Sequence, residues 1–429
     1  MMRFYKKNKV IFHNFIWRGL QIASKQGTLF IFTLIAAKLL SVDDFGKFTY
    51  YFTTILLLTM LSDFGLSSAI SKYTAEYNYK DKQKINSLTT SSLVLLAAIS
   101  IIIIVFSGLI GSYFLEDSQL MYILLPLVFL VPATSVFDGI FRGLENFKTL
   151  TKISSLTTIL SILPFYWSIK SFGVSGLAWA YLIFYFLLLC LTVIFYAHIN
   201  GKKFGEFNFN VYITRQVLNY SYYLGLAALS YFMFSRFTII LMGHFGFIEQ
   251  VAYYELISRF EAIFLLPFFI AGHVFAPKIT ALYAKEKPGK FYKVLKKTRN
   301  YTLLSSITSA IIFLGIVLIV IQFYFGNYDT PSFRIILLIE SFLFIIKSYS
   351  VVIDFGFVIS TGYGHLMAYR YLIIAVINIA LSLLLNNYLG YLGIIISMFF
   401  CHILMTLSLH LKFFNLIKYQ SKVQKHKLS

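Results

Sequence analysis

The sequence has few charged residues, and this scarcity excludes an ordinary soluble protein. Only 13% of the 429 residues are Asp, Glu, Lys or Arg, whereas 59% are hydrophobic, and the mean hydropathy is +0.77. A soluble domain has about 25% charged residues and uses them to cover its core. A bilayer removes that requirement, because lipid contacts apolar side chains directly. The composition therefore predicts an integral membrane protein.

Cysteine and the motifs of catalysis are also scarce. The two cysteines, Cys190 and Cys401, lie in apolar runs and form neither a disulfide framework nor a zinc pattern. The chain has no P-loop, no nucleophile elbow and no phosphate-cradling Gly-rich loop, and its eight histidines are scattered without ligand spacing. We therefore expect no cofactor, no metal site and no enzymatic activity.

What the chain does have is a series of long apolar segments. A helix needs about 20 mostly apolar residues to cross a bilayer. The first segment is too long for a cleaved signal peptide, and it carries Arg18 and Lys25. We predict an all-α polytopic membrane protein of about twelve transmembrane helices. They cover residues 14–40, 45–70, 87–111, 120–141, 152–169, 174–198, 216–242, 251–276, 301–325, 332–359, 366–387 and 391–411.

The excess of positive charge indicates an orientation in the membrane. The chain has 37 Lys and Arg against 17 Asp and Glu, a net charge of +20. Of these cations, 28 fall in the segments on the side of the N-terminus and only 3 on the other side. Because cytoplasmic loops are enriched in Lys and Arg, both termini are predicted to be cytoplasmic. The basic loops can contact anionic lipid headgroups, and we expect no nucleic-acid partner.

An internal repeat appears when the chain is shifted on itself by 206 residues. Gly19 then meets Gly225, and the run 72–77 meets the run 278–283 with four of six residues identical. Six helices separate the two copies, so the repeat is parallel. Chance similarity between apolar segments is the alternative. The repeat predicts two six-helix bundles related by a pseudo-two-fold axis, with domains at residues 1–200 and 201–429.

Four cations inside the predicted spans are candidates for binding an anionic group. Arg18 and Lys25 share one face of the first helix with Gln21, Arg236 lies deep in the seventh helix, and Lys347 lies in the tenth. Intramembrane charges usually face a protein interior or a water-filled cavity. Arg and Lys there suit phosphate or pyrophosphate. The alternatives are that Arg18 reaches the membrane surface and that the others form structural ion pairs.

Three acidic residues are candidates for coupling transport to an ion. Glu340 and Asp354 recur at seven-residue spacing with Lys347 and Thr361, which predicts one stripe along a helix. The stripe could form a proton or cation relay, or it could pair with Arg236 or Lys25 across helices. Asp63 has no local partner in the sequence.

Two further acids have a basic residue four positions later. The pairs Glu255 with Arg259 and Asp138 with Arg142 fit local ion pairs on single helices. We expect both pairs to be structural.

Several runs resemble one known family of membrane transporters. They are Phe15-Ile16-Trp17-Arg18-Gly19, Ala36 to Gly46, Leu61-Ser62-Asp63-Phe64-Gly65-Leu66 and Lys72-Tyr73 in the first half, and Arg236 to Gly243, Ala252-Tyr253-Tyr254 and Phe275-Ala276-Pro277-Lys278 in the second half. These runs are similar to Wzx-type polysaccharide flippases, which belong to the superfamily that includes multidrug exporters and the lipid II flippase. Ser235 departs from the family, whose members often have an acidic residue there.

The resemblance implies a substrate and a mechanism. The substrate would be an undecaprenyl-pyrophosphate-linked oligosaccharide, moved by alternating access from the cytoplasmic to the periplasmic leaflet of the bacterial inner membrane. It would serve O-antigen and lipopolysaccharide synthesis, with a polysaccharide polymerase and the chain-length machinery as partners. A cation-coupled multidrug exporter is the first alternative, although it would favour an acidic cleft. An integral-membrane polymerase or glycosyltransferase is the second, although no long loop is present to hold its active site.

Overall fold

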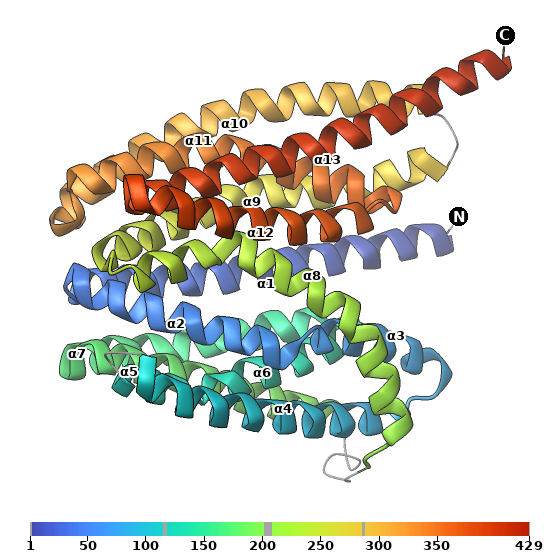
Figure 1. Ribbon diagram of the computed structural model, residues 1–429. Helices are drawn as coiled ribbons and strands as arrows, with labels where there is room; N and C mark the ends of the chain where they lie inside the picture. The colour runs from blue at the N-terminus through green and yellow to red at the C-terminus, as the bar shows by residue number, and fades with distance from the viewer. Residues whose placement is uncertain (1, 115–117, 201–207, 285–287, 429) are drawn as a thin grey trace. The chain divides into compact units, whose positions relative to one another are not determined.

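The computed structural model describes residues 2–114, 118–200, 208–284 and 288–428, and these residues form helices and no strand (Figure 1). Parts of the predicted basic loops at 199–215 and 277–300 lie outside the described residues. In chain order the helices are α1 (Met2–Leu39), α2 (Val42–Asp63), α3 (Leu66–Lys80), α4 (Lys84–Phe114), α5 (Ser118–Leu124), α6 (Leu127–Gly143), α7 (Phe147–Asn200), α8 (Val211–His244), α9 (Ile248–Ala284), α10 (Pro288–Tyr324), η2 (Gly326–Tyr328), α11 (Pro331–Ile353), η3 (Asp354–Val358), η4 (Ile359–Thr361), α12 (His365–Leu389) and α13 (Tyr391–Leu428).

The number of membrane spans agrees with the sequence. Among the described residues, 11 helical stretches are long and apolar enough to cross a bilayer. The longest, Phe147–Ile199, contains two of the predicted spans, because the chain reverses at Gly173 with φ 58° and ψ −133°. The reversal brings the Phe165 and Tyr181 rings to a centroid distance of 5.5 Å. The prediction of about twelve transmembrane helices is therefore confirmed.

The reversal at Gly173 recurs between α12 and α13. Gly390 has φ 58° and ψ −139°, nearly the same backbone conformation. A second glycine follows three residues later in each turn. A Cβ on Gly176 would lie 2.0 Å from the Ser168 carbonyl oxygen, and one on Gly393 would lie 2.4 Å from the Leu385 oxygen. Both turns therefore require glycine at two positions, and the pattern repeats at the last helix pair of each half of the chain.

The second predicted span is broken, which the sequence reading missed. α2 ends at Asp63, Phe64 and Gly65 adopt positive φ of 30° and 81°, and α3 begins directly afterwards. At the break the chain touches α8, because a Cβ on Gly65 would lie 2.6 Å from the backbone nitrogen of Gly225. A Cβ on Gly225 would likewise lie 2.5 Å from the Phe64 carbonyl oxygen. The helix is interrupted where these two backbone segments meet, and the close contact requires glycine in each of them.

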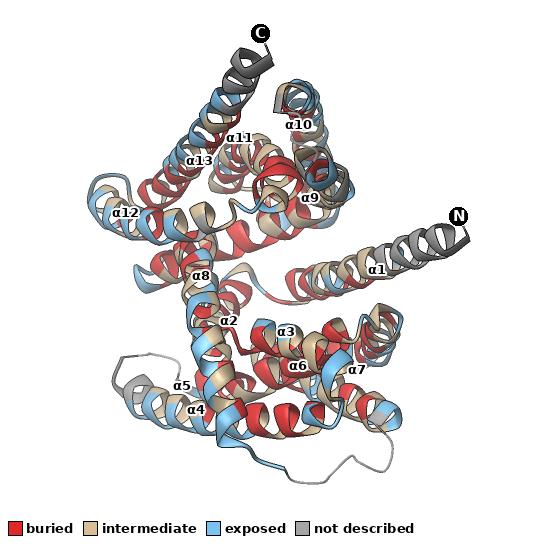
Figure 2. Ribbon diagram, turned by 90° about the vertical axis from the view of Figure 1, so that its right-hand side faces the viewer, coloured by how far each residue is buried: buried red, intermediate tan, exposed pale blue. Residues whose placement is uncertain are grey.

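The described chain divides into two compact units, Met1–Leu229 and Ser230–Ser429. In the first, Leu88, Phe137 and Ile140 belong to a core of buried residues from α3, α4, α6, α7 and the start of α8. In the second, Phe291 and Phe413 belong to a core from α8 to α13. Figure 2 shows buried residues along the packed faces of the helices and exposed residues on their other faces. The boundary between the two units lies within α8, between Leu229 and Ser230. The division into repeat domains at residues 1–200 and 201–429 stays a prediction.

Candidate functional site

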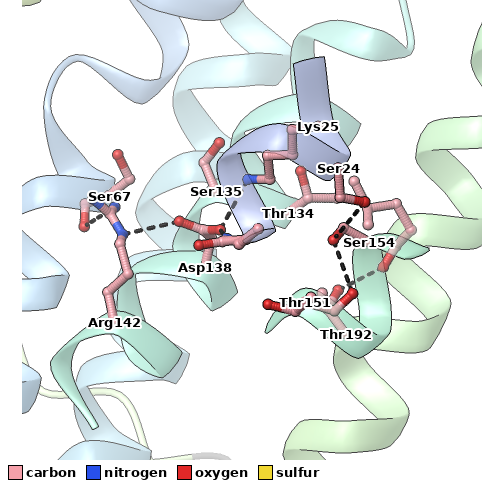
Figure 3. A network of polar contacts seen from close by, with 12 residues as sticks. Ser24, Lys25, Ser67, Thr134, Ser135, Asp138, Arg142, Thr151, Ser154 and Thr192 are labelled. Carbon is pink, nitrogen blue, oxygen red and sulfur yellow. Dashed lines mark hydrogen bonds and ion pairs between the residues drawn. The ribbon is translucent and has the colours of Figure 1, made fainter. Parts of the chain in front are cut away.

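Asp138 on α6 is the centre of a polar cluster in the first unit. Its Oδ1 lies 2.9 Å from Lys25 Nζ and accepts a hydrogen bond from the Gln21 amide at 2.9 Å, both from α1. Its Oδ2 lies 2.9 Å from Arg142 Nε, one turn further along α6. Figure 3 shows Lys25 and Arg142 reaching Asp138 from opposite sides. The local pair of Asp138 and Arg142 is confirmed, and the Lys25 partner is new, since only the folded helices bring residue 25 to residue 138.

The polar face of α1 continues on both sides of this carboxylate. The Arg18 guanidinium donates a hydrogen bond to the Gln21 side-chain oxygen, so the predicted stripe of Arg18, Gln21 and Lys25 is a connected network. Further along, the Thr28 hydroxyl lies 2.6 Å from that of Thr158 on α7. A small cavity of about 30 Å³ beside Lys25 is lined by Asp138 and hydroxyl-bearing residues on one part and by Leu150, Ile153 and Leu188 on the other. This volume is enough for a water molecule or a single polar group.

The first cluster contains more positive than negative charge. Three cations, Arg18, Lys25 and Arg142, surround one carboxylate, Asp138. The Lys25 side chain is still 49% exposed, although it is paired. A surplus cation inside a span calls for a further anion or for water. This cluster can therefore accept an anionic group without first losing its internal pairs.

A second cluster in the other unit joins α9 to α11 through Lys347. Lys347 Nζ lies 2.8 Å from Glu261 Oε2 and 3.1 Å from Glu340 Oε2. The side chains of Glu261 and Glu340 are 5% and 1% exposed, and the second oxygen of each has no hydrogen-bond partner within the protein. Two buried carboxylates thus share one lysine. Sequence spacing predicted that Glu340 and Lys347 share one stripe, but it predicted neither their direct contact nor the contact with Glu261, which lies on a different helix.

Arg236 is held by a carboxylate of α9. Its guanidinium lies 2.8 Å from Glu255 Oε2, while Arg259 Nε donates to Glu255 Oε1 at 2.6 Å. The local pair of Glu255 and Arg259 is confirmed. Pairing of Arg236 with the α11 stripe was one alternative from the sequence, but in the structure its ion-pair partner is Glu255 of α9. In the second unit the three cations Arg236, Arg259 and Lys347 are therefore matched by three carboxylates, Glu255, Glu261 and Glu340.

Asp354 leaves the predicted α11 stripe and pairs with α13. Its Oδ1 lies 2.9 Å from His410 Nε2, and both side chains are buried. Asp354 also begins the π-helical turn η3, which adds a residue to the turn. Thr361 follows it in the 3₁₀ turn η4, where its hydroxyl donates to the Phe357 carbonyl. The seven-residue stripe therefore holds for Glu340 and Lys347 but not for all four residues.

Asp63 has a local partner, contrary to the sequence expectation. Its Oδ1 accepts the backbone N–H of Ser67 at 3.2 Å, and its Oδ2 accepts the Ser67 hydroxyl at 3.1 Å. Ser67 lies in the first turn of α3, where backbone N–H groups lack intrahelical partners. The carboxylate thus caps the helix that restarts after the break. The Asp63-Phe64-Gly65 sequence, a capping residue followed by glycine, carried this signal.

An ion pair of Asp329 and Arg334 lies at the start of α11, and Asp329 itself precedes the span that begins at Pro331. Asp329, just before α11, accepts hydrogen bonds from Arg334 Nε at 2.8 Å and from its terminal nitrogen at 2.9 Å. These bonds hold the pKa of Asp329 below its ordinary value. Elsewhere, no group of three His, Cys, Asp or Glu among the described residues is arranged to hold a metal ion.

The clusters lie in a chain that matches a known family over most of its length. The model of the family described as "Polysaccharide biosynthesis protein" matches residues 11–282. The chain belongs to this polysaccharide biosynthesis protein family. The matched part includes the whole Asp138 cluster and extends through Arg236 to Glu261. Lys347 and Glu340 lie beyond it.

A curated relative and two solved structures share features with this family member. Stage V sporulation protein B of Bacillus subtilis (strain 168) is 28% identical over 141 residues, which is 31% of this chain and 27% of the relative's own length. The match therefore spans about a quarter of that relative. A multidrug resistance MATE family transporter of the MOP superfamily, in an inward-facing conformation, has a TM-score of 0.70 at 16% identity, covering 92% of this chain and 95% of the other. A MOP superfamily transporter from Pyrococcus furiosus, described as having a binding pocket of reverse polarity, has a TM-score of 0.58 at 15% identity, covering 96% of each chain. These structures show that the polysaccharide biosynthesis protein has a MOP-type transporter fold.

Proposed function

We propose that this protein is a Wzx-type flippase that moves an undecaprenyl-pyrophosphate-linked oligosaccharide from the cytoplasmic to the periplasmic leaflet. Family membership supports a role in polysaccharide synthesis, and the transporter fold supports movement across a membrane rather than catalysis. The proposed location is the bacterial inner membrane, with both termini cytoplasmic as the loop charges indicate. O-antigen or lipopolysaccharide synthesis is the proposed context, with a polymerase and chain-length machinery downstream.

The observation that carries the proposal is the surplus of positive charge around Asp138. Arg18, Lys25 and Arg142 outnumber the carboxylate three to one, and Lys25 is half exposed. Pyrophosphate is the part of the substrate that carries charge, and Arg and Lys bind phosphate oxygens through charge-assisted hydrogen bonds. We therefore assign the pyrophosphate contact first to Arg18 and Lys25, with the isoprenoid chain remaining in lipid.

Arg236 and Lys347 are proposed as secondary contacts to the anion. Each is already paired with buried carboxylates, so the substrate would have to displace Glu255 from Arg236, or Glu261 and Glu340 from Lys347. Displacement leaves a carboxylate uncompensated, which is costly in a buried site. These two cations therefore suit a transient step of transport rather than initial capture.

Ion coupling is proposed at the acids of the second unit. Glu340 shares Lys347 with Glu261, so the three groups together have one negative charge more than positive. Uptake of one proton would neutralise the excess, and its release would restore it. Asp354 is a second candidate, through its pair with His410. Asp63 ranks last, because capping α3 already accounts for its carboxylate.

Two alternatives make different predictions for cells that lack the protein. A multidrug exporter of the same fold would change drug susceptibility and leave surface polysaccharide intact. A membrane-embedded polymerase or glycosyltransferase would leave short or incomplete glycans already exposed on the outer leaflet. The proposed flippase instead predicts that complete lipid-linked repeat units accumulate on the cytoplasmic leaflet.

The test is depletion of the protein in its own host, followed by extraction of lipid-linked oligosaccharides. We expect full-length repeat units to accumulate and surface polysaccharide to fall. Re-expression of the wild-type chain should restore the surface polymer, whereas Arg18→Gln/Lys25→Gln should not. Unchanged lipid-linked intermediates together with altered drug sensitivity would favour the exporter and refute the flippase.

A further inference from the structure

The reversal of α7 at Gly173 creates an apolar groove that the proposed transport does not use. The groove has a volume of about 370 Å³ and lies between the two halves of the hairpin. Its lining residues are Pro164, Trp167, Ser168, Phe172, Trp179 and Ile183. The volume lies within the range of small-molecule binding pockets. This size suits part of a flexible chain or a small apolar molecule.

The walls of the groove are almost entirely apolar. The Trp167 and Phe172 rings pack edge to face with centroids 6.3 Å apart. The hydroxyl of Ser168 does not contribute a free polar group, because it donates to the Gly176 carbonyl oxygen at 2.8 Å. Trp167 and Phe172 are 65% and 62% exposed, although they are large and hydrophobic. Such a surface needs an apolar occupant.

The position of the groove limits what that occupant can be. Each half of α7 is long enough to cross a bilayer, so the turn at Gly173 lies at a membrane surface. Trp side chains are enriched at that depth, where lipid headgroups meet the acyl chains. The molecules that surround the groove are therefore membrane lipids, and an acyl chain is the apolar group at hand.

An exposed cation, Lys170, lies in the same helical turn as two of the lining residues. It comes three residues after Trp167 and two before Phe172, so it shares a helix face with Trp167. Lys47, also in an outward loop by charge distribution, pairs with Asp43 at 2.7 Å. Among the described residues, Lys170 has no carboxylate within ion-pair distance. An unpaired lysine beside an apolar groove complements a lipid with an anionic headgroup.

The second hairpin shows that the turn itself does not require these residues. At the positions equivalent to Trp167, Lys170 and Trp179, the hairpin of α12 and α13 has Leu384, Asn387 and Ile396. The backbone turn is nearly identical, and the same two glycines support it. The aromatic residues and the cation are thus additions to one of two equivalent hairpins.

We propose that the α7 groove is a binding site for an anionic phospholipid, with one acyl chain between Trp167 and Trp179 and the phosphate at Lys170. The site does not depend on which substrate the protein transports. It would hold a lipid at the membrane surface opposite the basic loops.

The test uses the fluorescence of the groove itself. The chain has three tryptophans, so in Trp17→Phe the emission excited selectively from tryptophan comes from Trp167 and Trp179. This variant is reconstituted into phosphatidylcholine bilayers that contain increasing fractions of brominated phosphatidylglycerol or, separately, brominated phosphatidylcholine. We expect half-maximal quenching at about a five-fold lower mole fraction for the anionic lipid, as one basic residue near the headgroups provides.

The second hairpin supplies the matched control. Lys170→Asn, copied from Asn387, should remove the difference between the two brominated lipids and leave the protein folded, as judged by its elution and thermal stability. Lys170→Arg should retain the difference. Equal quenching by both lipids in the parent protein, or a preference that survives Lys170→Asn, would overturn the proposal. Relief of quenching by undecaprenyl phosphate at a lower fraction than unbrominated phosphatidylglycerol would overturn the choice of a phospholipid.

Discussion

The buried triad of Glu261, Lys347 and Glu340 makes the strongest prediction about stability. Replacing the lysine in Lys347→Met leaves two carboxylates, 5% and 1% exposed, without the ammonium that lies 2.8 and 3.1 Å from them. Breaking a buried ion pair by removing one partner costs about 3–5 kcal/mol, because the remaining charge is uncompensated. We therefore expect Lys347→Met to lower stability by about that amount.

Removing the two carboxylates as well should restore most of the stability that Lys347→Met loses. Glu340→Gln alone keeps the pair of Lys347 with Glu261, so its loss of stability should stay below about 3 kcal/mol, the upper value for a hydrogen bond to a charged group. In Glu261→Gln/Lys347→Met/Glu340→Gln no charge remains, and replacing buried pairs with neutral groups is often close to neutral. Most of the loss should be recovered.

The assay is the thermal midpoint in detergent, followed by size-exclusion chromatography of the remaining folded protein. The expected order is wild type and Glu340→Gln highest, the triple variant next, and Lys347→Met lowest. A triple variant no more stable than Lys347→Met would show that unpaired carboxylates do not cause the loss. A Lys347→Met protein as stable as wild type would show that the triad does not form.

Three further predictions concern the first unit. Gly225→Ala should destabilise the protein by about 1–3 kcal/mol, because its Cβ would lie 2.5 Å from the Phe64 carbonyl oxygen. The control is Gly19→Ala, whose Cβ meets nothing within 4 Å. In the same melting assay it should be neutral or up to about 1 kcal/mol stabilising. Asp63→Asn should keep the cap on α3 and retain transport, whereas Asp63→Ala should lose about 1 kcal/mol of stability. Loss of transport in Asp63→Asn would instead show that the Asp63 carboxylate takes part in ion coupling. Asp138→Leu should lower the melting temperature more than any of these, because Lys25 and Arg142 lose their shared carboxylate and Gln21 loses its acceptor.

The sequence predicted those features of the fold and of the candidate site that depend on residues close together in the chain. Apolar length predicted the spans, since each helix satisfies its own backbone in lipid. Spacing of four residues predicted the pairs of Glu255 with Arg259 and Asp138 with Arg142, because both partners share one helix. Matching glycines mark the two hairpins, although their equivalence became clear only from the backbone angles at Gly173 and Gly390.

The rest depended on which helices lie together. Lys25 meets Asp138, and Lys347 meets Glu261, across distances in sequence that no periodicity reports. These partners change the interpretation of the intramembrane cations. The sequence predicted four similar anion contacts, whereas the structure divides them into a cluster with surplus positive charge around Asp138 and cations that carboxylates already neutralise.

Transport of a lipid-linked pyrophosphate by this protein is tested most directly by a flipping assay in proteoliposomes. The substrate is undecaprenyl-pyrophosphate oligosaccharide, and its arrival in the outer leaflet is followed by lectin binding or enzymatic cleavage. We expect transfer in proteoliposomes with the wild-type protein to be much faster than in protein-free liposomes. We expect Lys25→Gln to raise the substrate concentration for half-maximal rate about ten-fold or more, since a hydrogen bond to a charged group contributes ~1.5–3 kcal/mol. Transfer no faster than in protein-free liposomes, or full activity in Arg18→Gln/Lys25→Gln, would contradict the proposed transport.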